Sequence, residues 1–591
     1  MKQFFKFMFA SMLGVFLVFL LFFFIMMGII MSAASFSKKE VVVVAENTVL
    51  HLKFDEAVAD RSSNNPFESF DFFSMSSSDS PGLNDILESL KKAKSDENIK
   101  GIYLDLGTVP SGIATVEEIR NGLIDFKKSG KFIICYGETY TQKAYYLASV
   151  ADKIYVNPEG IIDFKGLNGE VMFYKGLLEK LDVDVQIIRH GKFKSAVEPF
   201  IYEKMSEPSK EQTLKYLTSI WDHMLEGISE YRKITKDDLN AIADSFRVQK
   251  AADAVTYKLA DKVMYKDEIL AELRTKLGLK ENDKISMLTM SKYVDAPDKN
   301  KKVSTSKNKI AVIYAIGSIE GGKGDDKTIG SDKISAAIRK ARLDSTVKAI
   351  VIRVNSPGGS ALASDVIWRE VVLAKKAKPV VASMGDVAAS GGYYISCAAT
   401  KILADPSTIT GSIGVFGMVP NLKGLFNNKL GITIDNVKTN NYADFGTTYR
   451  PLTESETGIY QLDVENIYQT FITHVAEGRG MTTDQVDSIG QGRVWSGVDA
   501  LKIGLIDEFG GLEKAIEVAA KLAKIEEYKI QSLPAQKEPF EQILESLSGG
   551  GSDETFLKAQ LGETYEYYKY IQGIKSMKGV QARMPYYINV Y

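Results

Sequence analysis

An internal repeat is the feature that most constrains how this chain can fold. Segments of the first half have counterparts in the second half, in the same order along the chain. The matched pairs are residues 101–106 with 349–354, 137–146 with 385–394, 175–177 with 423–425, and 247–261 with 493–507. Because two copies of one pattern are expected to share one fold, we predict a tandem duplication of a unit of roughly 200 residues.

Within each half, apolar runs typical of strands alternate with stretches that have helical spacing. The expected strands are residues 99–106, 132–136, 309–316, 349–354 and 379–383, and the expected helices are residues 116–128, 334–341 and 363–374. This alternation predicts an α/β fold in which a parallel sheet is covered by helices on both faces.

The chain has 591 residues, which is too long for a single core. We expect four parts: an N-terminal transmembrane anchor over 1–40, a first α/β repeat over 41–290, a polar and lysine-rich linker over 291–308, and a second α/β repeat over 309–591. Each repeat is long enough to form its own core.

The N-terminal segment predicts a membrane location. An apolar run extends from Phe7 to Ala34 and is long enough to cross a bilayer as a helix. Lys2 and Lys6 before it favour a cytoplasmic N-terminus, with the body of the protein on the outer side of the cytoplasmic membrane. Two lysines after the run weaken this preference, and Ser32–Ala34 resembles a cleavage site, so removal as a signal peptide stays an alternative.

Composition excludes several functional classes. The formal net charge of -2 does not favour nucleic acid as a partner. The two cysteines, Cys135 and Cys397, lie in apolar surroundings and are expected in the core, in neither a disulfide nor a metal site. We therefore expect no metal and no cofactor.

The stretch from Met384 to Ile395 holds the first catalytic candidate. Ser390 lies among small residues after a buried strand, and we expect Gly385 to turn the chain and a helix to follow over 393–399. Backbone N–H groups at the start of a helix face any developing negative charge. Taken alone, the stretch is equally typical of a small-residue helix start packed under a sheet.

The two copies differ in a way that indicates one shared site. Ser390 of the second copy lies opposite Gln142, and Lys194 of the first copy lies opposite Tyr442 or Ala443. Each copy thus holds a residue that the other lacks. A site with its serine from one copy and its lysine from the other explains this pattern economically.

Such a pair would carry out nucleophilic acyl transfer. A serine hydroxyl needs a base at neutral pH, and a lysine serves as one if burial lowers its pKa. The turn after the strand 349–354 places Gly358 and Gly359 where their N–H groups are unobstructed by side chains. Together with the N–H of Gly391 they would form an oxyanion hole, in which one donor typically contributes roughly 3 kcal/mol.

Weaker base candidates are Lys192, His190, His223, His474 and Glu198. Strand alternation cannot choose between Lys192 and Lys194, because residues two apart point to the same face. The histidines at 223 and 474 occur at similar places in both copies, which favours a structural role. For His190 we expect a surface turn, and for Glu198 a solvated carboxylate or a lysine partner.

Four motifs resemble the signal peptide peptidase A (protease IV) family in its long, duplicated form. They are Lys-Ser-Ala-Val-Glu-Pro at 194–199, Asn-Ser-Pro-Gly-Gly at 355–359, Ala-Ser-Gly-Gly-Tyr-Tyr at 389–394 and Gly-Ser-Ile-Gly-Val at 411–415. The resemblance implies Ser390 as nucleophile and Lys194, not Lys192, as general base. It also implies that the hydroxyl of Ser412 holds the lysine amine, although the residues alone indicate only a turn there.

The same resemblance implies the fold and the biological setting. It predicts the ClpP/crotonase spiral of ββα units and a membrane-anchored, bowl-shaped homotetramer with its body outside the cytoplasmic membrane. The implied substrates are signal peptide remnants and other peptides with small or apolar residues. We therefore expect a membrane-bound serine endopeptidase. A crotonase-type acyl-CoA enzyme and a non-catalytic membrane scaffold are the alternatives.

Overall fold

The computed structural model describes residues 2–36, 42–64, 70–71, 76–77, 80–300, 305–325, 327–536 and 579–584. Residues 301–304 of the predicted linker, and residues 537–578 and 585–591 of the predicted second repeat, lie outside the described residues. The predicted domain boundaries stay predictions.

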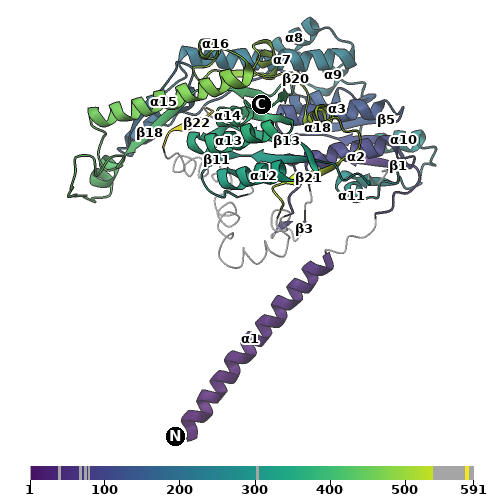
Figure 1. The fold of residues 1–591 in the computed structure, drawn as a ribbon. Coiled ribbons are helices and arrows are strands. Elements are labelled where there is room, and N and C mark those ends of the chain that lie inside the picture. Colours follow the sequence, from purple (N-terminus) through teal and green to yellow (C-terminus); the bar gives the residue numbers. More distant parts are fainter. Residues whose placement is uncertain are drawn as a thin grey trace.

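The N-terminal helix α1 (Lys2–Phe36) projects away from the body (Figure 1). Its 35 residues make it about 52 Å long at 1.5 Å per residue. The segment Gln3–Phe24 has a mean hydropathy of 2.6, and none of it is buried in the protein. The helix is thus long and apolar enough to cross a membrane, either as an anchor or as a signal sequence.

The first sheet is parallel throughout and has the order β8-β6-β5-β4-β1-β9. Its strands are β1 (Thr48–Leu52), β4 (Ile99–Asp105), β5 (Phe132–Tyr140), β6 (Lys153–Ile162), β8 (Lys262–Val263) and β9 (Met287–Thr289). The apolar runs at its centre are buried on both faces, as expected for a parallel sheet under helices. The apolar run 41–54 predicts a first strand, and β1 covers only Thr48–Leu52 of it.

The second sheet repeats this order as β20-β16-β15-β13-β10-β21, again with parallel pairs. Its strands are β10 (Lys309–Ile316), β13 (Val347–Ser356), β15 (Val380–Ala389), β16 (Lys401–Ala404), β20 (Glu508–Phe509) and β21 (Lys529–Leu533). Two further strands, β17 (Ile409–Gly411) and β19 (Val494–Ser496), extend it beside β15. The shared order confirms the α/β class and the tandem duplication.

The helices repeat as well. In the first copy α2 (Leu83–Ser95) packs on α3 (Ile113–Lys127), and in the second α12 (Ser331–Leu343) packs on α13 (Ala361–Ala377). Each buries one apolar face against its sheet; in α3 this face includes Ile119, Leu123 and Phe126, all fully buried. The helix α3 also contacts β15 of the other copy, so the two copies pack directly on one another (Figure 1).

A buried ion network joins the two copies. Arg353 on β13 is fully buried, and its guanidinium donates to Asp60 at 2.6 Å and to Glu118 of α3 at 2.5 Å. Asn355 donates to the second oxygen of Asp60 at 2.7 Å. Because burial removes water from all these charges, each depends on its partner across the interface between copies.

A third sheet combines strands from distant parts of the chain, in the order β12-β11-β14-β22-β18-β7. The strands are β7 (Asp184–Arg189), β11 (Ser318–Glu320), β12 (Thr328–Gly330), β14 (Gly358–Ser360), β18 (Phe416–Asn421) and β22 (Gln581–Arg583). The antiparallel pairing of β7 with β18 joins a strand of the first copy to a strand of the second copy. Lys194 lies five residues beyond this strand.

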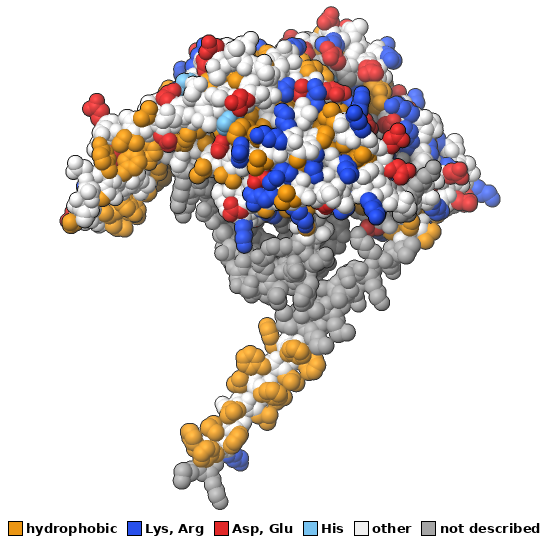
Figure 2. Space-filling view, viewed as in Figure 1, with side chains coloured by type: hydrophobic (Ala, Val, Ile, Leu, Met, Phe, Trp, Pro, Cys, Tyr) orange, Lys and Arg blue, Asp and Glu red, His pale blue; other side chains and the backbone are white. Residues whose placement is uncertain are grey.

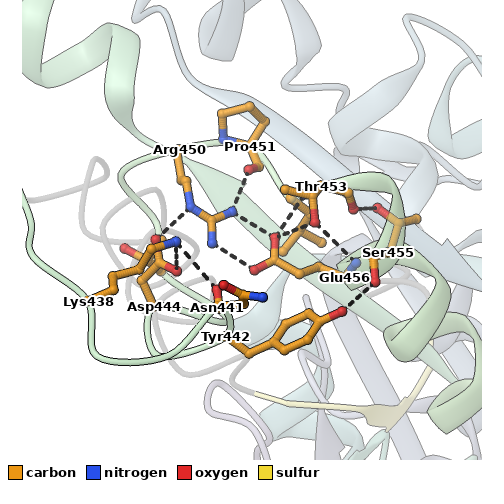
Figure 3. Close-up of polar contacts among 12 residues, drawn as sticks. Lys438, Asn441, Tyr442, Asp444, Arg450, Pro451, Thr453, Ser455 and Glu456 are labelled. Carbon is orange, nitrogen blue, oxygen red and sulfur yellow. Dashed lines mark hydrogen bonds and ion pairs between the residues drawn. The ribbon is translucent and has the colours of Figure 1, made fainter.

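An arm over residues 422–453 reaches away from the body beside the long helix α15 (Glu454–Arg479) (Figure 1). Apolar side chains gather on this part of the molecule (Figure 2), and Leu430, Ile432 and Val437 of the arm are exposed. At the base of the arm, Arg450 donates to Asp444 at 2.8 Å and to Glu456 at 2.7 Å (Figure 3). These ion pairs hold the arm against the N-terminus of α15.

The prediction that Gly385 turns the chain is wrong. Gly385 lies inside β15, which continues to Ala389 before α14 (Gly391–Ser396) begins. Its lack of a side chain has another cause, because a Cβ there would meet the Asn355 side chain at 3.0 Å. The glycine therefore provides room for the neighbouring strand end.

Candidate active site

Ser390 lies between the end of β15 and the start of α14. Its backbone has φ 54° and ψ -112°, a conformation that non-glycine residues rarely adopt. The backbone N–H of Ser390 donates to the Gly411 carbonyl at 2.8 Å, and its carbonyl accepts from the Tyr394 N–H at 2.8 Å. The strained turn is thus held from both sides, as is frequent at functional sites.

Lys194 lies in the segment that follows β7, directly before a short 3₁₀ turn over Ser195–Val197. Its Nζ donates to Ser390 Oγ at 2.8 Å. It also donates to Ser412 Oγ at 3.1 Å and to the Ser412 carbonyl at 3.2 Å. One chain therefore brings together the serine of its second copy and the lysine of its first.

The environment of this lysine favours the uncharged amine. The side chains of Lys194, Ser390 and Ser412 are fully buried. Burial lowers the pKa of Lys194 well below its usual range, because the ammonium loses the water that stabilises its charge. A neutral amine can accept a proton, so the pair has the electrostatics that a general base requires.

Ser412 is held as firmly as Ser390. Its φ is 49°, and its N–H donates to the Arg493 carbonyl at 2.7 Å. Its hydroxyl donates to the Gly492 carbonyl at 3.4 Å and accepts from Lys194. A Cβ at Gly492 would stand 2.6 Å from the Lys194 Cα, so this close approach of two backbones requires glycine.

The three predicted oxyanion glycines lie together beside Ser390. Gly358 has a φ of +94°, and a Cβ there would stand 2.6 Å from the Gly391 nitrogen and 2.1 Å from the Ala582 carbonyl oxygen. A Cβ at Gly359 would stand 2.0 Å from the Ile319 carbonyl oxygen of β11. Neighbouring backbones therefore leave no room for a Cβ at Gly358 or Gly359. This is a second reason for glycine at both positions, in addition to the exposure of their N–H groups.

The other base candidates lie elsewhere. Lys192 is exposed, with its Nζ 5.1 Å from the centre of the Phe193 ring. The histidines pair with carboxylates: His190 with Glu465 at 2.6 Å, His223 with Glu117 at 2.6 Å and His474 with Asp365 at 3.2 Å. Among the described contacts, none of them touches Lys194 or Ser390.

The expectation for Glu198 is wrong. Its side chain is 1% exposed and accepts from Ser206, from the N–H at 3.1 Å and from the hydroxyl at 2.6 Å. Ser206 in turn caps α7 (Glu207–Arg232). The carboxylate therefore fixes the start of this helix and is neither solvated nor paired with a lysine.

Sequence reasoning missed a residue that positions Lys194. Gln212 on α7 donates to the Phe193 carbonyl at 3.0 Å and to Ser195 Oγ at 2.9 Å, and so contacts both neighbours of the lysine. Its side-chain oxygen accepts from the Val494 N–H at 3.1 Å. No motif surrounds this glutamine. The one sequence signal that could have identified it is a polar residue on the predicted buried face of an amphipathic helix.

Comparison with known proteins finds relatives that share most of this chain. Protease 4 from Salmonella typhi is 38% identical over 476 residues, which are 79% of this chain and 76% of that protein. The chloroplastic serine protease SPPA from Arabidopsis thaliana is 34% identical over 513 residues, 85% of this chain and 74% of that protein.

A solved ClpP1 mutant from Listeria monocytogenes matches 35% of this chain and 94% of its own, with 16% identity and a TM-score of 0.24, too low to decide a shared fold. The pattern of Peptidase family S49 matches twice, over residues 125–280 and 373–526, once in each copy. The chain therefore belongs to peptidase family S49.

Proposed function

We propose that this chain is a serine endopeptidase in which Ser390 is the nucleophile and Lys194 the general base. The observation that carries the proposal is the 2.8 Å contact between Lys194 Nζ and Ser390 Oγ inside a fully buried site. Membership of a peptidase family favours this function over an acyl-CoA enzyme or a non-catalytic scaffold.

The proposed reaction passes through an acyl-enzyme. The Lys194 amine takes the hydroxyl proton of Ser390 while Oγ attacks the peptide carbonyl. The backbone N–H groups of Gly358, Gly359 and Gly391 stabilise the resulting oxyanion. The lysine ammonium then protonates the leaving amine, and a water molecule, deprotonated in the same way, hydrolyses the ester. Ser412 keeps the amine directed at Ser390 in both steps.

The substrates we propose are signal peptide remnants and other peptides with small or apolar residues. The resemblance to signal peptide peptidases supports this class, and the apolar helix α1 would hold the enzyme beside such remnants in the cytoplasmic membrane. We also propose that the catalytic body lies on the outer, periplasmic side and that four copies assemble. Cross-linking in membranes and protease protection of intact cells test these two points.

Labelling with a fluorophosphonate and hydrolysis of an alanine-containing peptide test the dyad. We expect both to be lost in Ser390→Ala and in Lys194→Ala, with unchanged circular dichroism. Lys192→Ala is the matched control, because this exposed lysine lies only two residues from the base, and it should keep full activity. Full activity in Ser390→Ala or Lys194→Ala would refute the assignment.

A further inference from the structure

The Ser356 hydroxyl is a buried polar group that the proposed reaction does not use. Ser356 is the last residue of β13, is fully buried, and lies two residues before the first glycine of the predicted oxyanion hole. Its Oγ accepts a hydrogen bond from the Gly358 N–H at 3.1 Å. The serine therefore contacts one of the N–H groups that the proposed reaction needs.

The direction of the Gly358 N–H depends on one soft rotation. The preceding residue, Pro357, has its own φ fixed by its ring and carries no N–H. The peptide between Pro357 and Gly358 can still turn over, because glycine accepts φ values of either sign; here its φ is +94°. After such a turn, a carbonyl oxygen would point where the N–H now points, and it would repel a developing negative charge.

Two hydrogen bonds hold this peptide in the observed orientation. The Gly358 N–H donates to Ser356, and the Pro357 carbonyl, at the other end of the same peptide, accepts from the Met584 N–H at 2.6 Å. Met584 comes from a distant part of the chain, whereas Ser356 belongs to the same turn as the glycine. The serine is thus the local contact that fixes the direction of this N–H.

The hydroxyl can fix this direction because the backbone of Ser356 is itself held on both sides. The side chain of the neighbouring Asn355 accepts from the Val387 N–H at 3.2 Å and donates to Asp60 at 2.7 Å. On the other side, a Cβ at Gly392 would stand 2.7 Å from the Ser356 carbonyl oxygen, so the first turn of α14 packs directly on this residue. The helix that follows the nucleophile therefore also places Ser356.

The contact with serine leaves the N–H available to an oxyanion. One N–H is commonly shared between two acceptors, and a charged oxygen forms a hydrogen bond roughly twice as strong as a neutral one does. The Gly358 N–H therefore stays with Ser356 while the substrate carbonyl is neutral, and it favours the oxyanion once charge develops. Such a donor contributes more in the transition state than in the ground state, which is the condition for raising kcat.

We propose that Ser356 is a positioning residue of the oxyanion hole, whose hydroxyl keeps the Gly358 N–H directed into the site. This inference rests on the proposed peptidase function. The serine acts through the glycine and does not itself touch the reacting atoms. Its loss should therefore affect the transition state and leave the binding of substrate unchanged.

Steady-state kinetics of Ser356→Ala test this role. Removal of an oxyanion donor typically lowers kcat by about 10²–10³-fold, and a donor that is only misdirected should cost less. We expect kcat for an alanine-containing peptide to fall at least about tenfold at unchanged KM. Ser396→Ala is the matched control, because this buried serine also bonds a backbone group, the Gly392 carbonyl at 2.8 Å, and it should keep wild-type kinetics. An unchanged or higher kcat in Ser356→Ala would overturn the proposal.

A transition-state analogue separates positioning from a loss of packing. A peptide aldehyde adds to Ser390 Oγ and places its former carbonyl oxygen in the oxyanion hole, whereas the matching peptide alcohol binds without this bond. In Ser356→Ala the aldehyde should bind at least about tenfold more weakly, and the alcohol should keep its wild-type affinity. Ser356→Cys, which fills the same space with a weak acceptor, should behave like Ser356→Ala. Equal weakening of both ligands would mean general damage to the site and would contradict a positioning role.

Hydrogen exchange at the Gly358 amide tests the contact without requiring activity. In the full-length protein in detergent, we expect exchange at this amide to rise at least about tenfold in Ser356→Ala and to stay at the wild-type rate in Ser396→Ala. Exchange that does not change in Ser356→Ala would refute the contact and the proposal with it. If the wild type neither hydrolyses peptides nor binds the aldehyde while the exchange result holds, the peptidase assignment fails and the positioning of the N–H by Ser356 stands.

Discussion

Replacement of Lys194 by methionine should abolish activity and, at neutral pH, stabilise the fold. Methionine has a similar length and no charge, and the two serine hydroxyls keep acceptors, Ser390 at the Gly414 carbonyl at 3.3 Å and Ser412 at the Gly492 carbonyl at 3.4 Å. Loss of a general base lowers kcat by about 10²–10⁴-fold, and more where the base activates the nucleophile. Stability should rise because the variant no longer keeps an amine out of water.

The pH dependence of this stabilisation follows from the lowered pKa of Lys194, for which burial is the cause. Below the usual lysine pKa of about 10.4, the unfolded chain binds a proton that the folded chain does not bind until the pH falls to its own, lower pKa. Stability of the wild type therefore rises with pH across this window. The free energy of unfolding that Lys194→Met gains over the wild type should therefore shrink by about 1.4 kcal/mol per pH unit as the pH approaches 10.

Denaturant unfolding of both proteins at several pH values between 7 and 10 measures this difference. Lys192→Met is the matched control, because it makes the same change at an exposed side chain two residues away. If the free energy of unfolding of Lys194→Met differs from that of the wild type by the same amount at every pH between 7 and 10, the buried amine titrates normally. The reasoning about the base would then fail.

Three further changes have expected outcomes. Gly358→Ala places a Cβ 2.1 Å from a backbone carbonyl oxygen at a φ of +94° and should lower kcat by about 10²–10³-fold, whereas Gly321→Ala, with nothing within 4 Å of its Cβ, should keep wild-type kinetics. Arg353→Met leaves two buried carboxylates unpaired and should destabilise the fold by about 3–5 kcal/mol in thermal or denaturant unfolding. Arg339→Met, at a half-exposed ion pair, should cost less than about 1 kcal/mol. A chain without α1 should be soluble without detergent and active, and an intact mass that includes residues 1–36 in protein extracted from membranes would decide for an anchor over a cleaved signal sequence.

The parts of the fold that depend on local pattern follow from the sequence. The strands β4, β5, β10, β13 and β15 and the helices α3, α12 and α13 overlap the ranges that apolar periodicity predicts, whereas the outer strands β6, β8, β9, β16, β20 and β21 are not predicted by it. The third sheet does not follow, because its strands come from segments hundreds of residues apart and β22 has only three residues. Local pattern also fails for Gly385, where the lack of a side chain leaves room for Asn355 on the neighbouring strand.

The same limit applies to the candidate site. Alternation cannot separate Lys192 from Lys194, since both would point to one face of a strand. In the structure this segment is not a strand, and Gln212 with Gly492 holds the backbone so that only Lys194 enters the core. The distinction arises from contacts with α7 and with the second copy, which one sequence does not reveal.

The two copies have diverged so far that no single substitution can create a second serine–lysine site from the counterparts of Ser390 and Lys194. Gln142, opposite Ser390, donates to the Gly166 carbonyl at 2.6 Å and accepts from its N–H at 2.7 Å, so the amide now holds a loop of the first copy. The counterpart of Lys194 is Tyr442 or Ala443, and both are exposed on the arm; Tyr442 is 51% exposed and forms a hydrogen bond with Ser455 (Figure 3). A lysine there would stay hydrated and protonated, and could not act as a base at neutral pH. Gln142→Ser should therefore create no second reactive serine, and fluorophosphonate labelling of Gln142→Ser in a Ser390→Ala background should stay at zero.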